Sequence, residues 1–245
     1  MAATAVIYNR QSSIFDQARF TKKVDVIGAG ATGSHVVYTL AKMGVQKIRV
    51  FDFDTVAEHN IPNQLFGLAD VGSFKVDALK KRIKDLCDID IEAVNAKIEP
   101  PPTMEQLEKM EDDGVRSEHY PYVPGDIVFL LTDTMKSRRE IFETFLQRSL
   151  TQLLIETRMG LDSGRIYTIR PGNATHAEKW LATLYSDAEA EVSLCGSSTA
   201  IACTAVQIAA MAVWQMLRYS KGAPFDNEQI FSLDPLLLAI QGSFN

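Results

Sequence analysis

Three glycines near the start of the chain occupy the positions that a bound phosphate requires. Gly28, Gly30 and Gly33 lie within residues 24–34 and keep the G-x-G-x-x-G spacing. The first glycine permits a tight turn, the second lets a phosphate approach the backbone, and the third lets a helix pack closely on the preceding strand. The N–H groups and dipole at the helix start also favour an anion. This segment predicts a nucleotide site, without distinguishing NAD from ATP.

A candidate acid for ribose binding follows the next predicted strand. Residues 47–51 form that strand, which ends at Asp52-Phe53-Asp54, and Asp52 lies 19 residues after Gly33. A doubly wound fold places the acid that binds the ribose hydroxyls at about this distance. Two alternatives remain: Asp52 only caps a turn, or the cofactor is NAD(P), because a dehydrogenase would use the same residues.

Length and charge limit the classes of protein to consider. The chain has 245 residues, 46% hydrophobic and 23% charged, which fits one large α/β domain, or one domain with a small insertion, with a substantial core. The formal net charge of −6 argues against nucleic acid as the main partner. The longest apolar stretch, residues 200–217, contains Thr204, Gln207 and Gln215, which favours a buried helix over a membrane span. We therefore expect no membrane association.

The cysteines indicate a compartment. Three of them, Cys87, Cys195 and Cys203, cannot form a disulfide framework, and no C-x-x-C pair offers a zinc site. The N-terminus lacks the basic and apolar regions of a signal peptide. We expect a reducing, cytoplasmic setting, with Cys203 in the core of the apolar helix.

The apolar pattern predicts strands that alternate with helices. This alternation is typical of an α/β, Rossmann-like fold: a mostly parallel sheet flanked by helices, here with a loop-rich C-terminal half. Ligands of such sheets bind at the carboxyl ends of the strands, where the glycine turn, Asp52, Asp54 and Asp133 all fall. The expected order is strand, helix and strand over 24–50, helix 75–86, strand 89–98, buried strand 126–131, helix 136–148, strands 152–156 and 164–169, an irregular loop over 171–194, a helix near 199–219 and a closing segment at 229–236.

Four motifs in order carry a resemblance. They are the segment Tyr-Asn-Arg-Gln at 8–11, the pair of segments 52–56 and 60–64 (Asp-Phe-Asp-Thr-Val and Asn-Ile-Pro-Asn-Gln), the segment Asp-Val-Gly-Ser-Phe-Lys at 70–75, and Thr-Asp at 132–133. Together they resemble the ThiF/MoeB family, the bacterial relatives of ubiquitin-activating enzymes. The resemblance covers nearly the whole chain.

The resemblance implies an adenylyltransferase that uses ATP and Mg²⁺. A single adenylation domain would span residues 1–245, with a nucleotide-binding half at 20–135 and a partner-binding and dimerisation half at 136–245. Such enzymes activate the C-terminal carboxylate of a small ubiquitin-like protein, usually ending in Gly-Gly. The carboxylate attacks the α-phosphate of ATP and gives an acyl-adenylate and pyrophosphate.

The resemblance also implies roles for individual residues. Lys75 would contact phosphate, Asp133 would hold Mg²⁺, and Arg10 would act in trans on the partner subunit's site in a homodimer. The alternatives are a solvated lysine, the N-cap of the helix that follows, and a surface arginine. The implied nucleotide-binding residues are Gly28, Gly30, Thr32, Gly33, Asp52, Asp54, Asn60, Asn63, Gln64 and Lys75; Asn60 and Gln64 could instead only satisfy a turn.

One position departs from the family pattern. Relatives usually carry arginine where this chain has Asn63, and asparagine can hydrogen-bond phosphate but brings no charge. ATP binding could be weaker, another cation such as Arg158 or Arg165 could substitute, or the chain could be an inactive dimeric binding module. The zinc-binding cysteine pairs of many relatives are also missing, which affects stability at most.

Cys195 is the candidate for a covalent step. It lies in Ser-Leu-Cys-Gly-Ser at 193–197, just before the apolar helix, and some relatives link covalently to the partner protein through a cysteine at about this place. A helix N-terminus lowers a thiol pKa, so thioester formation or sulfur transfer is one interpretation. A small residue at a loop-to-helix junction is the other.

Two further functions remain open. Within the family, the substrate could be a peptide C-terminus or the carboxylate of a modified nucleoside instead of a ubiquitin-like protein. Outside it, an NAD(P)-dependent oxidoreductase explains the glycines and Asp52 but leaves Arg10, Lys75 and Asp133 without roles.

Overall fold

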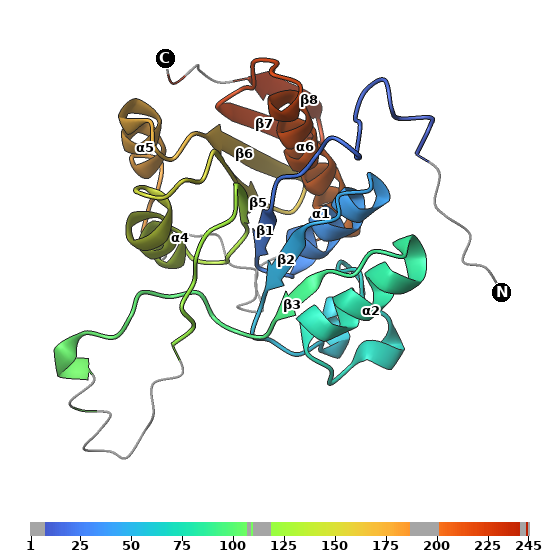
Figure 1. The fold of residues 1–245 in the computed structure, drawn as a ribbon, viewed down its shortest axis with the longest axis horizontal. Helices are drawn as coiled ribbons and strands as arrows, with labels where there is room; N and C mark the ends of the chain where they lie inside the picture. The colour runs from blue at the N-terminus through green and yellow to red at the C-terminus, as the bar shows by residue number, and fades with distance from the viewer. Residues whose placement is uncertain (1–7, 107–108, 110–118, 187–200, 241–243, 245) are drawn as a thin grey trace.

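One eight-stranded sheet organises the molecule. The structure, a computed structural model, describes residues 8–106, 109, 119–186, 201–240 and 244. The strand order is β3-β2-β1-β4-β5-β6-β7-β8, in which β3 to β5 run parallel and β6 to β8 are antiparallel (Figure 1). The strands are β1 (Val24–Ile27), β2 (Ile48–Phe51), β3 (Glu92–Val94), β4 (Ile127–Leu130), β5 (Leu153–Met159), β6 (Ser163–Ile169), β7 (Glu228–Leu233) and β8 (Leu236–Ile240).

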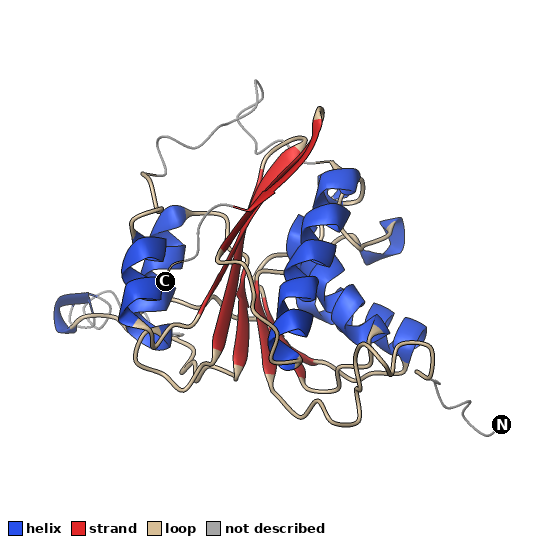
Figure 2. Cartoon of the chain, turned by 90° about the horizontal axis from the view of Figure 1, so that it is seen from above, coloured by secondary structure: helices blue, strands red, loops and turns tan. Residues whose placement is uncertain are grey.

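Helices cover both faces of the sheet, as expected for parallel strands, which are buried on both sides (Figure 2). One layer contains α1 (Ala31–Lys42), α2 (Lys75–Cys87) and α6 (Ala202–Ser220), and α1 packs extensively against α6. The other contains α4 (Met135–Ile141), a π-helical turn (Phe142–Leu146) and α5 (Ala174–Leu181). Two single 3-10 turns, Glu58–Asn60 and Leu68–Asp70, lie between β2 and α2.

The core forms two clusters because successive side chains of a strand point to opposite faces. Val24 and Val26 of β1 lie in the cluster beneath α1 and α6, while Ile27 lies in the cluster with Phe142 and Trp180. All four residues of β1, β2 and β4 are buried. The Rossmann-like, mostly parallel sheet flanked by helices is confirmed.

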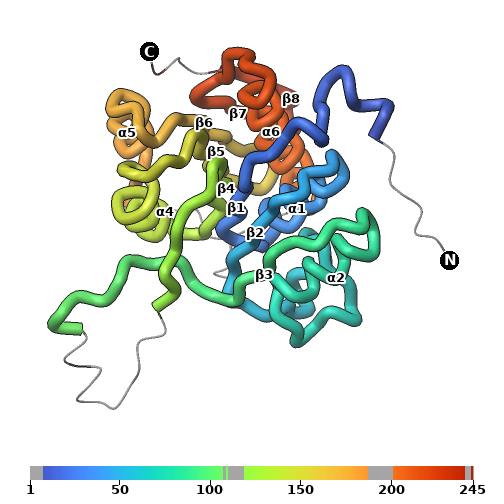
Figure 3. Tube along the Cα trace, viewed as in Figure 1, coloured from blue at the N-terminus to red at the C-terminus, as the bar shows by residue number. Residues whose placement is uncertain are grey.

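A long connection between β3 and β4 extends away from the sheet. Residues 95–106 run outward from β3 and residues 119–125 return to β4 (Figure 3). The alternation that predicted a strand over 89–98 therefore overestimates it. The parallel register pairs Phe51 with Val94, and because β2 ends at Phe51, Asn95 and the residues after it have no strand to pair with.

The second half is more regular than expected. The prediction of an irregular segment over 171–194 is wrong at its start, where α5 begins after Asn173, whose side chain accepts a hydrogen bond from the His176 N–H at 3.1 Å. The closing segment is a hairpin of β7 and β8. The expected helix over 136–148 changes to a π-helical turn after Ile141. None of the described helices has the length and apolar character needed to cross a membrane.

Candidate active site

A cavity of about 310 Å³ opens at the carboxyl ends of β1, β2 and β4. The parallel register places Ile27 level with Phe51 and with Leu130, so that the residues following the three strands meet at one edge. The cavity is lined by the glycine turn, the β2 end, the start of α2, the β4 end with α4, and the segment after β3: Ile27, Gly28, Gly30, Phe51, Asp52, Phe53, Asp54, Lys75, Ala96, Lys97, Ile98, Glu99, Leu131, Thr132, Asp133, Thr134, Lys136, Ser137 and Glu140.

The three glycines have three different surroundings. Gly28 has φ +101°, and a Cβ there would lie 2.6 Å from the Leu131 carbonyl oxygen. A Cβ on Gly33 would lie 1.9 Å from the Gly28 carbonyl oxygen, so this glycine permits α1 to pack against the turn. A Cβ on Gly30 would meet nothing within 4 Å, and Gly30 lines the cavity. Gly30 therefore leaves open the approach to the start of α1, which has no side-chain cap.

Asp52 supports the glycine turn and faces the cavity. Its Oδ2 accepts a hydrogen bond from the Ala29 N–H at 2.7 Å, and its Oδ1 accepts one from the Asp54 N–H at 2.9 Å. Burial raises the pKa of Asp52 above its ordinary value, although Lys75 and the two N–H donors oppose this shift. Each carboxylate oxygen can accept a further bond, which is the arrangement that a ribose hydroxyl needs.

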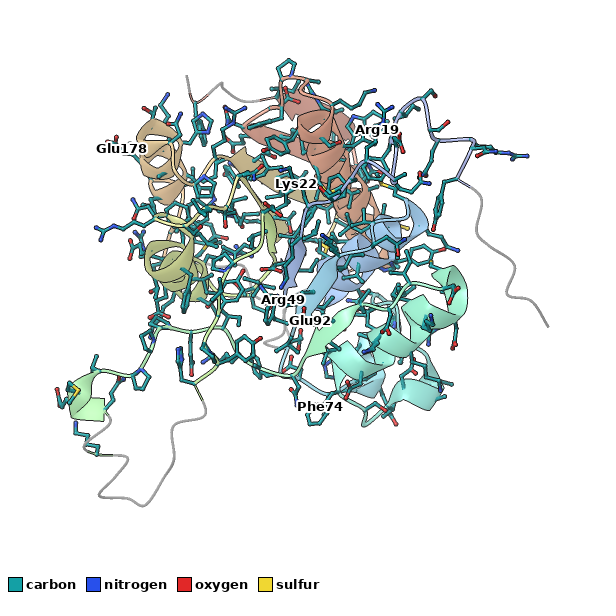
Figure 4. All side chains as sticks on the ribbon, viewed as in Figure 1. Arg19, Lys22, Arg49, Phe74, Glu92 and Glu178 are labelled. Carbon is teal, nitrogen blue, oxygen red and sulfur yellow. The ribbon has the colours of Figure 1, made fainter. Side chains whose placement is uncertain are left out.

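Lys75 is held at the start of α2, directly after Phe74, which is labelled in Figure 4. Its side chain is only 8% exposed, and Nζ lies 2.8 Å from Asp54 Oδ2. The backbone N–H of Lys75 also donates to the Asp54 carbonyl at 2.9 Å. The alternative of a solvated lysine is thereby excluded, since the ammonium group is buried at the cavity wall.

Asp133 lies in an exposed turn between β4 and α4. In the described part of the chain its carboxylate accepts no hydrogen bond and forms no ion pair, and it lines the cavity. Thr134 is the N-cap of α4, because its side chain accepts a hydrogen bond from the Ser137 N–H at 3.1 Å. The alternative in which Asp133 caps this helix is therefore wrong, and its carboxylate is available to a ligand.

The donor set suits Mg²⁺ brought by a nucleotide. Within the described residues no group of three or more His, Cys, Asp or Glu side chains could hold a metal ion. Mg²⁺ does not need such a group, because it usually keeps several waters and binds through one or two carboxylates plus substrate phosphates. The Asp133 carboxylate fits that role.

Five of the expected nucleotide-binding residues do not line the cavity. Thr32 and Gly33 are buried in the first turn of α1. Asn60 is buried, and its Oδ1 accepts a hydrogen bond from the Ala57 N–H at 2.9 Å, so this side chain holds a turn. Asn63 and Gln64 follow that turn beside α1, where the Leu65 N–H donates to Ser34 Oγ at 3.0 Å. Contact of these five residues with a nucleotide stays a prediction.

Arg10 lies at the opposite end of the molecule from the cavity of its own chain. Its neighbour Gln11 donates from Nε2 to the Met43 carbonyl at the C-cap of α1, whereas the cavity lies at the N-terminal end of that helix. Twelve residues of α-helix span about 18 Å. Arg10 itself is exposed. Arg10 does not line the cavity of its own chain, and its role at a partner subunit's site stays a prediction.

The other candidate residues do not line the cavity within the described part of the chain. Cys195 lies outside the described residues. Cys203 is exposed, so the expectation that it belongs to the core is wrong. Neither Arg158 nor Arg165 lines the cavity: Arg158 contacts Glu156 and Thr183, and Arg165 pairs with Glu228 at 3.0 Å. These arginines do not replace the charge missing at Asn63.

Sequence reasoning missed two parts of the cavity wall. One is the segment 96–99, of which residues 96–98 fall within the predicted strand over 89–98, and the other is Lys136 and Glu140 on α4. Their i, i+4 spacing, which gives an ion pair at 3.7 Å, was a signal for one exposed helix face next to Asp133.

Curated relatives match part of this chain. Ubiquitin-like modifier-activating enzyme 5 of Drosophila willistoni is 27% identical over 166 residues, which is 67% of this chain and 40% of the fly protein. tRNA threonylcarbamoyladenosine dehydratase 2 of Saccharomyces cerevisiae is 41% identical over 71 residues, 27% of this chain and 16% of the yeast protein. The chain thus spans less than half the length of these relatives.

Solved structures share the fold. Escherichia coli MccB superposes with a TM-score of 0.67 at 18% sequence identity, over 91% of this chain and 62% of MccB. It has also been solved with ATP. PaaA superposes with a TM-score of 0.64 at 18% identity, over 90% of this chain and 64% of PaaA.

The profile of the ThiF family matches residues 8–240, which is nearly the whole chain. It includes the glycine turn, Asp52, Lys75 and Asp133, the residues that meet at the cavity. The chain belongs to the ThiF family.

Proposed function

We propose that this protein is an ATP-dependent adenylyltransferase that activates the C-terminal carboxylate of a ubiquitin-like protein. A carboxylate oxygen attacks the α-phosphorus of ATP and forms the acyl-phosphate bond. The bond from the α-phosphorus to the α,β-bridging oxygen breaks, and pyrophosphate leaves with that electron pair. No proton has to be transferred, because the attacking group is already ionised.

The observation that carries this proposal is the meeting of Gly30, Lys75 and Asp133 at one cavity. Transfer of a nucleotidyl group depends on positioning and on neutralising phosphate charge more than on acid–base chemistry. Gly30 leaves the backbone open to phosphate, the Lys75 ammonium brings a positive charge, and Asp52 is placed for the ribose hydroxyls. A dehydrogenase has no use for Lys75 and Asp133.

Mg²⁺, held by Asp133 and by phosphate oxygens, would supply charge neutralisation for the leaving pyrophosphate. The chain's own contribution is to orient the Asp133 carboxylate and to keep it unpaired. Asp54 has a different task, because its Oδ2 lies 2.8 Å from Lys75 Nζ and fixes where that charge sits.

We assign Arg10 to the site of a second copy of the chain. Its exposure and its position near the C-terminal end of α1, away from its own cavity, support a role at the nucleotide of a partner subunit. A homodimer would then restore a positive charge that Asn63 does not provide. Mixing Arg10→Ala chains with Asp133→Ala chains tests this: mixed dimers regain one intact site, whereas each variant alone has none.

The substrate's identity and the fate of the adenylate belong to the same proposal. The fly relatives are named as ubiquitin-like modifier-activating enzymes, which supports a ubiquitin-like partner. The MccB structures, one of which contains ATP and others the MccA peptide, favour a peptide C-terminus as the second candidate. If a thioester forms, Cys195 is the candidate nucleophile, and Cys195→Ala would stop after the adenylate.

ATP–pyrophosphate exchange tests the function. We expect exchange that needs Mg²⁺ and a substrate with a free C-terminal carboxylate, and that is lost in Asp133→Ala. Ubiquitin-fold proteins ending in Gly-Gly and short peptides form the two substrate panels, and amidated C-termini are the matched controls. Substrate binding without exchange would instead identify an inactive binding module, and tighter binding of NADH than of ATP would favour an oxidoreductase.

A further inference from the structure

A buried arginine holds the turn that carries Asp133. The Arg138 side chain is 7% exposed, and its Nη2 donates to the Thr132 carbonyl at 2.6 Å and to the Thr157 carbonyl at 3.1 Å. Thr132 immediately precedes Asp133, and Thr157 lies in β5. One guanidinium group therefore ties the Asp133 turn to the neighbouring strand.

Glu156 fixes the position of that guanidinium. This carboxylate is fully buried, and its Oε1 lies 3.1 Å from Arg138 Nη1. Its Oε2 lies 3.1 Å from Arg158 Nη2 and accepts a hydrogen bond from Trp180 Nε1 at 3.3 Å. Arg158 continues the network, because its Nη1 donates to the Thr183 carbonyl at 2.8 Å. Arg138 is thus held from two sides, by Glu156 of β5 and by the Thr132 carbonyl of the turn, while Trp180 of α5 holds Glu156 in place.

The other side-chain hydrogen bonds that order the Asp133 turn, within the described residues, are local ones among Thr132, Thr134 and Ser137. Asp133 and Thr134 are exposed, and the α-helical part of α4 has only 7 residues, too short to be stable by itself. On the other side Ser137 Oγ donates to Thr132 Oγ1 at 2.8 Å. Both contacts act on the backbone and side chain of Thr132, and the Asp133 carboxylate stays available to the cavity.

We infer that Arg138 is a positioning residue for the Asp133 carboxylate. This inference depends on the proposed role of Asp133 as the protein ligand of Mg²⁺. Groups that orient a metal ligand without touching the metal typically change metal affinity about 10–100-fold when they are mutated. Arg138 acts through the Thr132 carbonyl and does not line the cavity.

The test is a titration of Mg²⁺ into the whole protein saturated with α,β-methylene-ATP, whose adenylyl group cannot be transferred because a methylene group replaces the bridging oxygen. Arg138→Gln removes the charge and the fork geometry, so we expect Mg²⁺ affinity to fall about 10–100-fold. Arg138→Lys keeps the charge but reaches one acceptor at a time, so we expect a smaller loss, about tenfold. Arg139→Gln is the matched control, because Arg139 is the next residue of α4, is 44% exposed and, among the described residues, forms its ion pair with Glu143.

The melting temperature of each variant is measured alongside. If Arg138 has only a structural role, Arg138→Gln will melt at a lower temperature but will bind Mg²⁺ as tightly as Arg139→Gln does. That result would overturn the inference. If Arg138→Gln does not fold, the comparison of Arg138→Lys with Arg139→Gln decides. Asp133→Asn distinguishes failure of this inference from failure of the metal role proposed for Asp133. If Asp133→Asn leaves the Mg²⁺ affinity unchanged, Asp133 is not the metal ligand, and the metal role and this inference fail together.

Discussion

Two aspartates on neighbouring strands show how differently the two ends of this sheet use a carboxylate. Asp25 of β1 is fully buried, and Arg49 of β2 donates to both of its oxygens, at 3.0 and 2.7 Å. Tyr122 Oη and the Gly125 N–H donate to the same carboxylate at 3.0 and 2.7 Å. Arg49 is labelled in Figure 4, on the strand next to Glu92 of β3.

Asp52 follows β2 at the other end of the strands, and in the part of the chain that the structure describes no arginine or lysine forms an ion pair with it. Two backbone N–H groups hold it, and its remaining acceptor capacity faces the cavity. Asp25 accepts all of these hydrogen bonds from protein groups, and so it joins β1, β2 and the returning segment 119–125. A carboxylate with open lone pairs beside a cavity serves a ligand, whereas one saturated by an arginine and a tyrosine serves the fold.

The largest effect on stability is expected at Asp25, whose carboxylate is fully hydrogen-bonded to protein groups. Asp25→Asn leaves Arg49 buried without its counter-ion, so we expect the free energy of unfolding to fall by about 3–5 kcal/mol. Urea titration measures this change. Glu92→Gln is the control, because its ion pair with Lys23 is exposed and is worth at most about 1 kcal/mol. Equal changes in unfolding free energy in the two variants would contradict a special structural role for Asp25.

Replacing Lys75 should lower activity strongly and stability little, the reverse of what we expect at Asp25. Lys75→Met keeps the apolar stem but removes the ammonium group, so we expect ATP–pyrophosphate exchange to fall by about 10²–10³-fold, as when one charge-stabilising donor is removed from an active site. The melting temperature should change little, because Asp54, its ion-pair partner, is 50% exposed and can be solvated. Full exchange activity in Lys75→Met would remove this residue from the mechanism.

The glycine turn sharpens the comparison within one site. Gly33→Ala places a methyl group 1.9 Å from the Gly28 carbonyl oxygen, so we expect a loss of about 1–3 kcal/mol in unfolding free energy. Gly30→Ala meets nothing within 4 Å, so its cost comes from the backbone alone, whose ψ of −148° lies outside the regions that L residues favour, and we expect a loss of about 1 kcal/mol. The binding of α,β-methylene-ATP should nevertheless weaken in Gly30→Ala, because the methyl group occupies the phosphate approach. Two equally destabilised variants would contradict this assignment.

Local patterns predicted those parts of the molecule that depend on local chemistry. The glycine spacing, Asp52 at a strand end and Lys75 at a helix start could all be identified, because each is set by residues close in the chain. The wall formed by Ala96–Glu99 could not, since its departure from the sheet depends on where β2 ends. Nor could α5, whose 8 residues give too few turns for a clear period.

The network of Arg138 and Glu156 could not be predicted from sequence patterns, for a different reason. Arg138 and Glu156 are on separate elements, and their contact exists only because α4 packs against the sheet beside β5. The same holds for Asp25 and Arg49, which are 24 residues apart. Charged residues in buried strands could have been singled out as needing partners, but the partners themselves are fixed by tertiary packing.

The smallest effect concerns the pH dependence of Asp52. Burial raises its pKa above the ordinary 3.8, against the opposing influence of Lys75 and two N–H donors. The folded state therefore holds this proton more tightly than the unfolded state, and Asp52 lowers stability progressively as pH rises from 3.8 through the raised pKa. The ionised form is the one that accepts the ribose hydroxyl, so the affinity for α,β-methylene-ATP should fall as pH drops through that same interval. Asp52→Asn should flatten both profiles relative to wild type. A binding midpoint at or below 3.8 would mean that burial does not raise the pKa of Asp52, and it would contradict this prediction.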